Sequence, residues 1–538
     1  KSKDDEAVND YKGQFAMYYA RILFFSFLTD SRVKSLQETI NHIKGNVDNL
    51  RIAPNLSLEI TILDLFQKHI NPFILSELDY KIHNINSLAN DSAISPIERA
   101  SNAMKKFSRL SDSEIVTPEF VTDKIINGLP AKAIDKNTML LDIASKQGEF
   151  VYAVYKKFGK EVANKFYSIP TSKIAYEFTR KVYKLLELDV KLIETNYTSY
   201  DLISENKFIE KETIKINNKK MKFNVIVGNP PYQQSDGGAQ ASAKPIYNLF
   251  VESAKELNPS YISIIMPTRW YAGGKGLDEF REIMLNDKHI SELHDFLKPD
   301  ILFQNTNNRG GICYFIRDKS YDNSKNLTKL FTYKNNLTPV LNIRSLKTPD
   351  SDILIRHSIA LEIISKVKSH KDFKTFENHI SSRKPFDLEG NVVNNTKKFR
   401  LDKKGLKKPI MCYGKSKKIG YLERDEITKN ANWIDNYKVF APYANNIGTE
   451  LNDDNLNAFV GEPKTICTET YIVMGASLNL DLISSTNLVK YFFTKFARFM
   501  HSLPKVSQHG TSKTYKFVPL QNFKSDSDIN WGKSTKEI

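Results

Sequence analysis

The chain has 538 residues, which is too long for one ordinary domain, so we expect about two to four domains. With 41% hydrophobic and 26% charged residues and no apolar run long enough to span a bilayer, the composition is globular and excludes a membrane-spanning protein. Lys and Arg total 78 against 62 Asp and Glu, and this charge of +16 suits a polyanion-binding protein and a merely soluble basic protein about equally.

Residues 1–110 form the first predicted region. Glycines are few, and apolar residues recur at helical spacing in YKGQFAMYYARILFFSFLTD and in SLEITILDLFQKHINPFIL. This pattern predicts a helical N-terminal region, and we expect its role to be packing rather than chemistry.

From 111 to 335, short apolar runs alternate with helical stretches. TMLLDIAS, KFYSIP, VKLIETN, FNVIVGN and YISIIMP are typical of buried strands, whereas FVYAVYKKFG and IAYEFTRKVYKLLEL are typical of helices. The alternation predicts βαβ units and therefore an α/β domain with a largely parallel sheet. Binding sites in such sheets lie at the carboxyl ends of the strands.

The first candidate site is the turn in LLDIASKQGEF. A strand is predicted to end at Asp142, a small-residue loop carries Gly148, and a helix begins at about Glu149. Such a turn lets a ligand approach the N–H groups at the start of the helix. Upstream, Thr117-Pro118 precedes another predicted helix, and a Thr cap followed by Pro at the first helical position explains this pair locally.

The strongest signal is Asn229-Pro230-Pro231-Tyr232, which directly follows the apolar run VIV. The prolines fix the backbone, and the ring of Tyr232 offers a face on which a planar base can stack. An aryl amine is a poor nucleophile because its lone pair is delocalised into the ring. If the Asn229 side-chain oxygen and the Pro230 carbonyl each accept one N–H, negative character builds on the nitrogen, which can then attack an electrophilic methyl group. The competing interpretation is a structural β-turn with a solvent-side Tyr.

The remaining sequence falls into two parts. Residues 336–395 are polar and mixed, which predicts a connection between domains. Residues 396–538 combine turn residues, aromatics and basic clusters, as in KPIMCYGKSKKIGYLERDEI, PYANNIGTELNDDN and KVSQHGTSKTYKFVPL. Basic and aromatic residues together suit contacts with the phosphates and grooves of double-stranded DNA, so we predict a DNA-binding domain over 396–538. For most individual Lys residues, a solvated charged face explains the composition as well.

In this order of motifs, the chain resembles the amino-methylating DNA methyltransferases that use S-adenosylmethionine, in particular the adenine-N6 enzymes of restriction–modification systems. The resemblance covers about 111–335 and, more loosely, the C-terminal part. It implies a Rossmann-like class I methyltransferase domain over 111–335. As in the gamma group of these enzymes, it also implies a mixed α/β target-recognition domain over 396–538. The target base would be flipped out of the duplex, and the catalytic residues would be Asn229, Pro230, Pro231 and Tyr232.

The same resemblance implies a cofactor site and a base site. The cofactor loop departs from the family pattern at Ile143, where Pro is usual, and at Lys146, where Gly is usual. No acidic residue follows the second strand for the ribose, so Thr171 or Ser172 is the expected substitute. Phe303 matches an aromatic residue that helps to hold the flipped base, and the helix AKPIYNLFVESAKEL is expected to turn Tyr247 and Phe250 inward. The expected cofactor residues are Thr117, Asp142, Ala144, Gly148, Phe150, Thr171, and Asn196 or Tyr197.

Three functions stay open at this point. The first is a sequence-specific adenine methyltransferase that serves as the modification enzyme, or as the modification part of a larger restriction enzyme, with N4 of cytosine as the other candidate amine. The second is a protein-glutamine methyltransferase, because those enzymes also use Asn-Pro-Pro-Tyr on an amide nitrogen; the charge of +16 and the long C-terminal extension argue against it. The third is a DNA-binding specificity module that has lost activity, which Lys146 and the missing acid suggest.

Features that the sequence lacks bear on partners and compartment. Cys313, Cys412 and Cys467 stand far apart and predict neither a disulfide framework nor a metal site, and none follows a Pro, as the thiol attack of C5-cytosine methylation would require. No Walker-type loop or nuclease motif is found, so we expect cleavage or translocation to reside in restriction or helicase domains or subunits outside this chain.

No signal peptide is found, which predicts a cytoplasmic protein without membrane association. A first residue of Lys rather than Met is consistent with excision from a longer chain.

Overall fold

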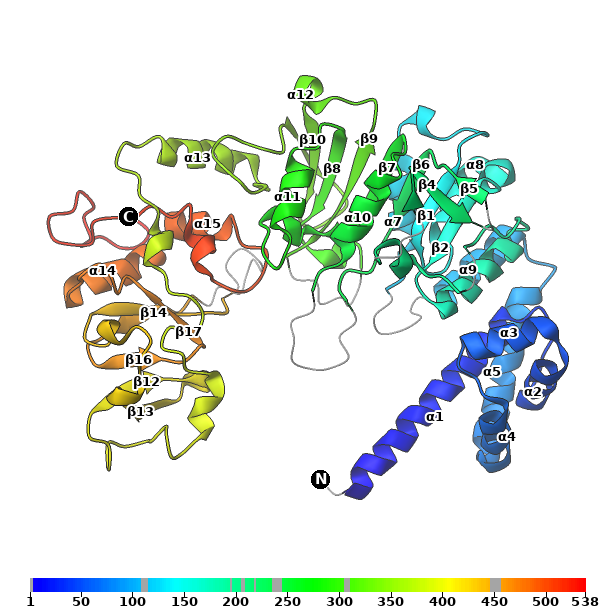
Figure 1. The fold of residues 1–538 in the computed structure, drawn as a ribbon, viewed down its shortest axis with the longest axis horizontal. Helices are drawn as coiled ribbons and strands as arrows, with labels where there is room; N and C mark the ends of the chain where they lie inside the picture. Colours follow the sequence, from blue (N-terminus) through cyan, green and yellow to red (C-terminus); the bar gives the residue numbers. More distant parts are fainter. Residues whose placement is uncertain are drawn as a thin grey trace.

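A central β-sheet flanked by helices lies between a helical N-terminal region and a C-terminal lobe, residues 353–538 (Figure 1). None of the helices among the described residues is long and apolar enough to cross a membrane. For residues 3–14 only the backbone is described. The computed structural model describes residues 3–107, 115–193, 196–204, 209–216, 219–234, 244–303, 310–445 and 456–538.

The central sheet confirms the predicted Rossmann-like α/β fold. Its strands stand in the order β11-β10-β8-β9-β7-β6-β1-β2, and β9 and β11 run antiparallel to the others. Chain order reverses between β1 and β6, since β2 lies on the outer side of β1 and β7 on the outer side of β6. The strands are β1 (Leu140–Ser145), β2 (Phe166–Pro170), β6 (Val225–Gly228), β7 (Tyr261–Pro267), β8 (Ile290–Phe296), β9 (Ile312–Asp318), β10 (Thr328–Tyr333) and β11 (Val340–Arg344).

Helices cover both faces of this sheet, which explains why its strands read as continuous apolar runs. Val225 and Val227 of β6 pack into the core that includes α8 and α9, whereas Ile226 packs into the core that includes α10 and α11. Tyr247 and Phe250 of α10 are buried in this second core, as predicted. The helices around the sheet are α7 (Glu119–Gly128), α8 (Glu149–Ala163), α9 (Lys173–Leu185), α10 (Tyr247–Glu256), α11 (Asp278–Leu285) and α12 (Asn323–Asn326). A small antiparallel sheet comprises β3 (Ile209–Glu210), β4 (Thr213–Ile216) and β5 (Lys219–Met221).

Two predicted strand boundaries differ from the structure. β1 does not end at Asp142 but continues to Ser145, because Ser145 still pairs with Pro170 of β2 after an irregularity in the register. In VKLIETN, the described residues form no extended strand, and Leu192 makes a single parallel bridge to Ser168. Residues 194–195 of that segment lie outside the described ranges.

The N-terminal region is helical, as predicted, and it shares a core with the sheet domain. Phe24 and Phe27 of α1 pack with Phe107 and with Phe178 of α9, with ring centroids between 5.0 and 5.4 Å apart. The region is therefore docked on α9 rather than independent of the sheet. Its helices are α1 (Lys3–Leu28), α2 (Leu36–Gly45), α3 (Val47–Asn55), α4 (Ile60–His69), α5 (Pro72–Asn90) and α6 (Pro96–Lys106).

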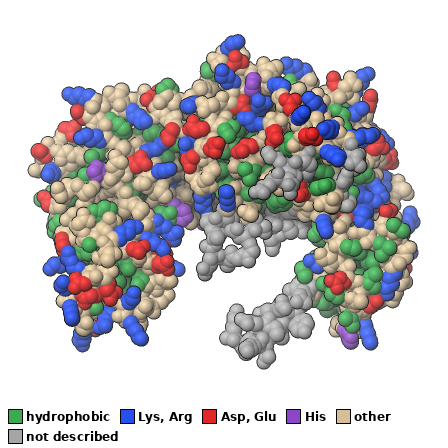
Figure 2. Space-filling view, in the orientation of Figure 1, with side chains coloured by type: hydrophobic (Ala, Val, Ile, Leu, Met, Phe, Trp, Pro, Cys, Tyr) green, Lys and Arg blue, Asp and Glu red, His purple; other side chains and the backbone are tan. Residues whose placement is uncertain are grey.

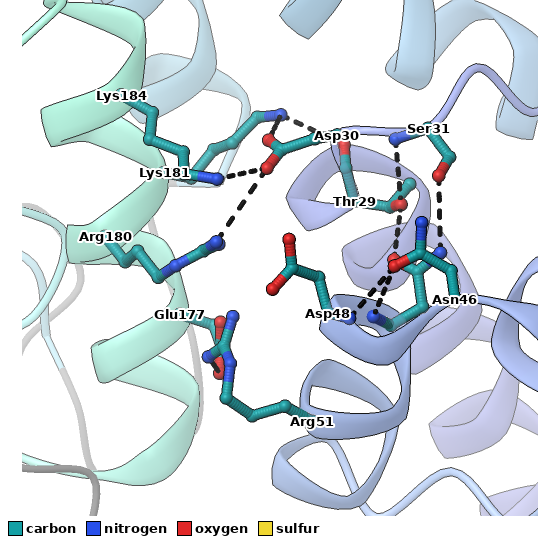
Figure 3. A network of polar contacts seen from close by, with 11 residues as sticks. Thr29, Asp30, Ser31, Asn46, Asp48, Arg51, Glu177, Arg180, Lys181 and Lys184 are labelled. Atoms are coloured by element: carbon teal, nitrogen blue, oxygen red, sulfur yellow. Dashed lines mark hydrogen bonds and ion pairs between the residues drawn. The ribbon is translucent and has the colours of Figure 1, made fainter.

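Charged contacts strengthen this docking (Figure 3). Asp30 follows α1 and faces three cations of α9: Arg180 at 3.8 Å, Lys181 at 3.1 Å and Lys184. Burial acts to raise the pKa of Asp30, but Lys181 and Lys184 outweigh it, so that pKa lies below its usual range. The Lys181 ammonium is itself buried and also donates to the carbonyl of Thr29 at 3.0 Å.

A carboxylate of α9 also binds the N-terminal helices. Glu177 is buried and accepts a hydrogen bond from Arg51 (Figure 3). It accepts another from Asn55 Nδ2 at 2.6 Å. One turn further along α9, Val182 lies against Gly148 in the predicted cofactor loop. The N-terminal helices thus fix the helix that supports this loop.

The C-terminal lobe is a mixed α/β structure with its own cores. The segment 336–395 does not act only as a connection, because it gives β11 to the central sheet and Ala360 and Ile364 of α13 to the lobe. The domain boundaries at 110, 335 and 395 stay predictions. The elements of the lobe are α13 (Ser358–Lys368), β12 (Pro409–Tyr413), β13 (Ile419–Glu423), β14 (Lys438–Pro442), β15 (Phe459–Gly461), β16 (Thr465–Cys467), β17 (Tyr471–Met474), α14 (Leu482–Phe492) and α15 (Lys495–Ser502).

Arg356 joins this lobe to the sheet. Its guanidinium forms a bidentate ion pair with Asp295 at the end of β8, with Nε 2.8 Å from Oδ2 and Nη2 2.5 Å from Oδ1. Asp295 is fully buried, and the remaining Arg356 Nη1 donates to the carbonyl of Gly310 at 2.7 Å. This ion pair therefore holds the lobe to the sheet, because separating Arg356 from Asp295 would leave a buried charge without a partner.

Candidate active site

The predicted cofactor loop and the Asn-Pro-Pro-Tyr segment meet at the carboxyl edge of the sheet. They follow β1 and β6, which are paired neighbours with Asp142 opposite Val227. Gly228 allows the close approach of the two strand ends, because a Cβ there would lie 2.9 Å from Ile143 Cγ1. Chain order reverses between these strands, which is where open α/β sheets bind ligands.

The cofactor loop is built as a cradle. Gly148 has a φ of 79°, which glycine adopts without strain, and an added Cβ would lie 3.3 Å from Val182 Cγ1. Asp142 Oδ1 accepts the N–H of Ala144 at 3.0 Å, whereas Asp142 Oδ2 is buried without a hydrogen-bond partner among the described residues. Phe150 is buried in the core and anchors the first turn of α8 below the loop. The loop therefore keeps one carboxylate oxygen free to accept a hydrogen bond from a ligand.

Charge in the loop favours a cationic ligand. Burial and then the neighbouring Glu149 raise the pKa of Asp142 well above its usual range, while Lys146 acts in the opposite direction. Two carboxylates and one ammonium carry one excess negative charge when all three are ionised. A ligand that brings a positive charge would offset it.

Thr117 orients Asn229. The sequence had predicted that Thr117 caps a helix, but it does not. The N-cap of α7 is Pro118, and the Thr117 hydroxyl instead lies 3.3 Å from Glu149 Oε1. An ionised carboxylate only accepts hydrogen bonds, so the hydroxyl donates to Glu149 and keeps its lone pairs for another donor. Asn229 Nδ2 is that donor, at 3.1 Å. Asn229 Oδ1 is thereby turned away from Thr117, and it is buried without a partner among the described residues.

Glu149 is the functional residue that sequence reasoning missed. Its Oε2 accepts the N–H groups of Gln147 at 2.8 Å and Lys146 at 3.3 Å, and its Oε1 receives Thr117. One buried carboxylate thus holds the cofactor loop and, through Thr117, the amide of Asn229. A signal for it was available, because an acidic residue in the first turn of a helix is placed to accept free N–H groups.

Lys146 connects the two loops directly. Its ammonium is buried and donates to the carbonyl oxygen of Asn229 at 2.6 Å. This lysine stands where the family pattern has Gly, so the departure gives the site an additional tie between cofactor loop and Asn-Pro-Pro-Tyr segment. The next residue, Gln147, donates from Nε2 to the carbonyl of Phe107 and so attaches the same loop to the N-terminal region.

The rest of the Asn-Pro-Pro-Tyr segment leads outward from the buried Asn229. Pro230 is buried, while Pro231 and Tyr232 are half-buried. The ring of Tyr232 meets Tyr247 edge to face, with centroids 6.5 Å apart. Burial raises the pKa of the Tyr232 phenol above its usual range, and its hydroxyl has no partner among the described residues.

Phe303 occupies a different environment. Only 3% of its surface is exposed, and it packs in the core that includes α8 and α9. The structure therefore does not present the face of its ring for stacking. Residues 304–309, which follow it, lie outside the described ranges.

The other predicted cofactor residues lie at and beyond the end of β2. Thr171 is buried and donates its N–H to the carbonyl of Ser145 at 3.0 Å, which places it beside the loop. Ser172 caps α9, since its hydroxyl accepts the N–H of Ala175 at 3.1 Å. Asn196 and Tyr197 are exposed on the segment that follows Leu192.

Comparison with known proteins gives a sequence match and several distant structural matches. An "Uncharacterized adenine-specific methylase" from Mycoplasma pneumoniae is 31% identical over 179 residues, which are 32% of this chain and 42% of that protein. The structure of a DrdV–DNA complex matches 96% of this chain and 68% of that one, at 11% identity and a TM-score of 0.47. The type IIL restriction-modification enzyme MmeI in complex with DNA matches 93% and 78%, at 10% identity and a TM-score of 0.44.

A family match covers the site. Residues 55–303 match the Eco57I restriction-modification methylase family, a range that includes the cofactor loop, the Asn-Pro-Pro-Tyr segment and Phe303. The Mycoplasma relative is matched over less than half of its own length. Over residues 55–303, this chain is therefore similar to the Eco57I restriction-modification methylase family.

Proposed function

We propose that this chain is a sequence-specific DNA adenine-N6 methyltransferase that uses S-adenosylmethionine. It would act as the modification enzyme, or the modification part, of a restriction–modification system. The observation that carries the proposal is Asn229 Oδ1, which has no partner in the described part of the chain and lies at the carboxyl edge of the sheet, in the same segment as the Pro230 carbonyl and Tyr232. The family match and the name of the Mycoplasma relative support the same reaction.

Asn229 and Pro230 would activate the amine. Each offers one oxygen to an N–H of the exocyclic amino group, which increases negative character on its nitrogen. The contact of Nδ2 with Thr117 keeps the amide from presenting its own N–H groups to the amine. The nitrogen would form its bond to the methyl carbon as the bond from that carbon to the sulfonium sulfur breaks, which leaves a neutral thioether, and it would then release one proton to solvent. The base would be flipped from the duplex and stacked on Tyr232.

The loop fits S-adenosylmethionine, which supplies an electrophilic methyl group when bound. Gly148 leaves space where a Cβ would approach Val182, and Asp142 Oδ2 is a free buried acceptor. When Asp142, Glu149 and Lys146 are all ionised, the two carboxylates leave one negative charge in excess of the ammonium. This excess matches the positive charge of a sulfonium group. The residues proposed to hold this cofactor are Thr117, Asp142, Ala144, Gly148, Phe150 and Thr171, with Asn196 or Tyr197 beside its adenine.

Affinity for S-adenosylmethionine should rise with pH. In the free protein the raised pKa of Asp142 means that its carboxyl group keeps its proton above the usual range. A cationic ligand favours the ionised form, so binding is weak below this raised pKa and strengthens as pH increases through it. Calorimetry over about pH 5 to 8, in buffers of different ionisation enthalpy, should detect proton release on binding.

Asp142→Asn should bind the cofactor more weakly and without this pH dependence. Asp135→Asn is the matched control, because Asp135 precedes the same strand and bonds Thr138 and Asn137 locally. The control should keep the pH dependence of the wild type. A wild-type affinity that stays constant over the whole range would remove Asp142 from cofactor binding.

Tyr232→Ala should weaken capture of the flipped base more than binding of the duplex. Stacking contributes about 1–3 kcal/mol per base. A duplex with 2-aminopurine at the target should brighten on binding wild type and brighten much less with the variant. Tyr321→Ala, in the turn before α12, is the control and should behave as wild type. Equal brightening with Tyr232→Ala would assign the stacking to another residue.

The proposed function is tested by methyl transfer from labelled S-adenosylmethionine to duplex DNA and, in parallel, to a release-factor peptide. Methylome sequencing of cells that express the chain then gives the base and the target. N6-methyladenine within one sequence motif is the expected result. N4-methylcytosine would change the base, and peptide methylation would identify a protein-glutamine methyltransferase. Cofactor binding without transfer to any substrate would indicate an impaired specificity module.

Partners follow from the same proposal. Double-stranded DNA would be the substrate, and the C-terminal lobe would read the target sequence. Restriction or helicase domains or subunits would complete the system. Figure 2 shows a hollow between the C-terminal lobe and the N-terminal helices, and Lys and Arg side chains gather on the side of the lobe that faces it. This placement supports DNA in the hollow, next to the carboxyl edge of the sheet.

A further inference from the structure

A group of basic side chains lies where the C-terminal lobe meets the sheet domain, and we call it the junction cluster. Two of its members follow β7, one in the 3-10 helix of residues 268–271 and one in the glycine-rich turn after it. The other three come from the C-terminal lobe. The members of the junction cluster are Arg269, Lys275, Arg383, Lys505 and His509.

Tyr443 forms the platform of the cluster on the side of the lobe. The ring of His509 stacks on Tyr443 with centroids 4.7 Å apart and an interplanar angle of 21°. The Arg383 guanidinium lies over the same ring, with Cζ 5.6 Å from its centroid. Lys505 is buried behind them, where its ammonium donates to the carbonyl oxygen of Asn445 at 2.6 Å and to Asn445 Oδ1. Tyr443 and Asn445 thus hold three basic side chains of the lobe in place.

The positive charge of the cluster is only partly compensated. Arg383 pairs with Glu469 at 2.9 Å, whereas Lys505 bonds to the neutral oxygens of Asn445. Arg269 Nε and His509 Nδ1 are buried without hydrogen-bond partners among the described residues. Burial lowers the pKa of His509, and the charges of Arg383, Lys505, Arg269 and Lys275 lower it further. Burial also lowers the pKa of Lys505 to about 7. An anion placed here would relieve both effects.

The cluster adjoins the proposed catalytic residues. The ring of Tyr247 contacts the ring of Tyr232, and Arg269 lies close enough for its charge to act on the phenol of Tyr247. The segment that carries Lys505 and His509 also touches the sheet domain, because a Cβ on Gly310 would lie 2.4 Å from the carbonyl oxygen of Val506. Tyr247 therefore links the surroundings of the cluster to the ring on which the base is proposed to stack.

We propose that the junction cluster binds the backbone phosphate beside the flipped nucleotide, with Arg269 and Arg383 as its principal contacts. This inference rests on the proposed function and adds to it a site for one DNA phosphate. A phosphate contact positions a strand without reading its sequence. Held between the sheet domain and the lobe, this phosphate would keep the extruded nucleotide above Asn229 while the lobe contacts the rest of the target. Arginine suits the task because its fork matches phosphate oxygens.

The test measures binding of a fluorescein-labelled 30-bp duplex between about 50 and 200 mM KCl, for wild type, Arg269→Gln and Arg383→Gln. Each lost phosphate contact should reduce the slope of log K against log salt by about one. Binding of S-adenosylmethionine by the intact variants should not change, since neither arginine lies in the cofactor loop. Lys325→Gln is the control, because Lys325 is an exposed cation on α12, and its slope should equal that of wild type.

A methylphosphonate scan then locates the phosphate. Neutralising one linkage next to the target adenine should weaken binding by wild type more than by Arg269→Gln, because that variant has already lost one of the two arginine contacts to this phosphate. Unchanged salt slopes in both arginine variants would overturn the proposed site. A wild type with the expected slopes that methylates no DNA would instead refute the proposed function, so the two failures are distinguishable.

Discussion

Asn229→Ala should lower kcat by about 10²-fold or more, as for the loss of a group that stabilises the transition state. Asn229 Oδ1 is the buried acceptor that would polarise the amine, and alanine leaves nothing in its place. Binding of S-adenosylmethionine and of duplex DNA should stay close to wild type, because the loop contacts of Glu149 do not involve the Asn229 side chain. Single-turnover methyl transfer, with both affinities measured in parallel, checks this split.

Two further variants sharpen the result. Asn224→Ala removes an asparagine just before the same strand, where Asn224 Oδ1 accepts the N–H of Met139 at 2.9 Å, and it should keep wild-type turnover. Thr117→Val keeps the shape of Thr117 but removes the hydroxyl that orients Asn229, so it should lower kcat less than Asn229→Ala does. Near wild-type turnover in Asn229→Ala would exclude Asn229 from the mechanism.

Arg356→Met should destabilise the protein by about 3–5 kcal/mol, because it leaves a buried carboxylate without its partner. Asp295 is fully buried, and Arg356 supplies two of its hydrogen bonds while also binding the carbonyl of Gly310. The expected observation is a urea unfolding transition, followed by tryptophan fluorescence, that begins at a clearly lower concentration than in wild type.

The double variant Arg356→Met/Asp295→Asn separates lost charge pairing from lost packing. Removing the stranded charge should recover part of the stability, which a double-mutant cycle measures as a coupling energy between the two positions. Lys408→Met is the matched control, since its pair with Asp425 at 3.0 Å is exposed and should contribute little. If Arg356→Met were no more destabilising than Lys408→Met, the ion pair would not hold the lobe to the sheet.

The local periodicity of apolar residues determined much of the secondary structure of this protein. The helices of the N-terminal region and the alternation of strands and helices follow from apolar spacing, and the buried run VIV reads as a strand because both faces of β6 are covered. The turn after β1 and the Asn-Pro-Pro-Tyr segment were also visible in the sequence, because Gly and Pro act on the backbone within a few residues. The resemblance to a methyltransferase family depended on these same local motifs, and residues 55–303 match the Eco57I restriction-modification methylase family.

Only the tertiary structure decided how these motifs are connected. Thr117, Glu149 and Asn229 lie far apart in the chain, and the pairing of β1 with β6 together with the packing of α7 on α8 brings them within hydrogen-bonding distance. A side chain that looks like a helix cap in sequence then becomes the group that orients an amide. The burial of Phe303 and the proximity of Arg269 to His509, on which its charge acts, likewise depend on how separate elements pack. Hydrogen bonds and charges act over a few ångströms in space. The separation of two residues in sequence predicts their distance in space only when both lie in the same helix or strand.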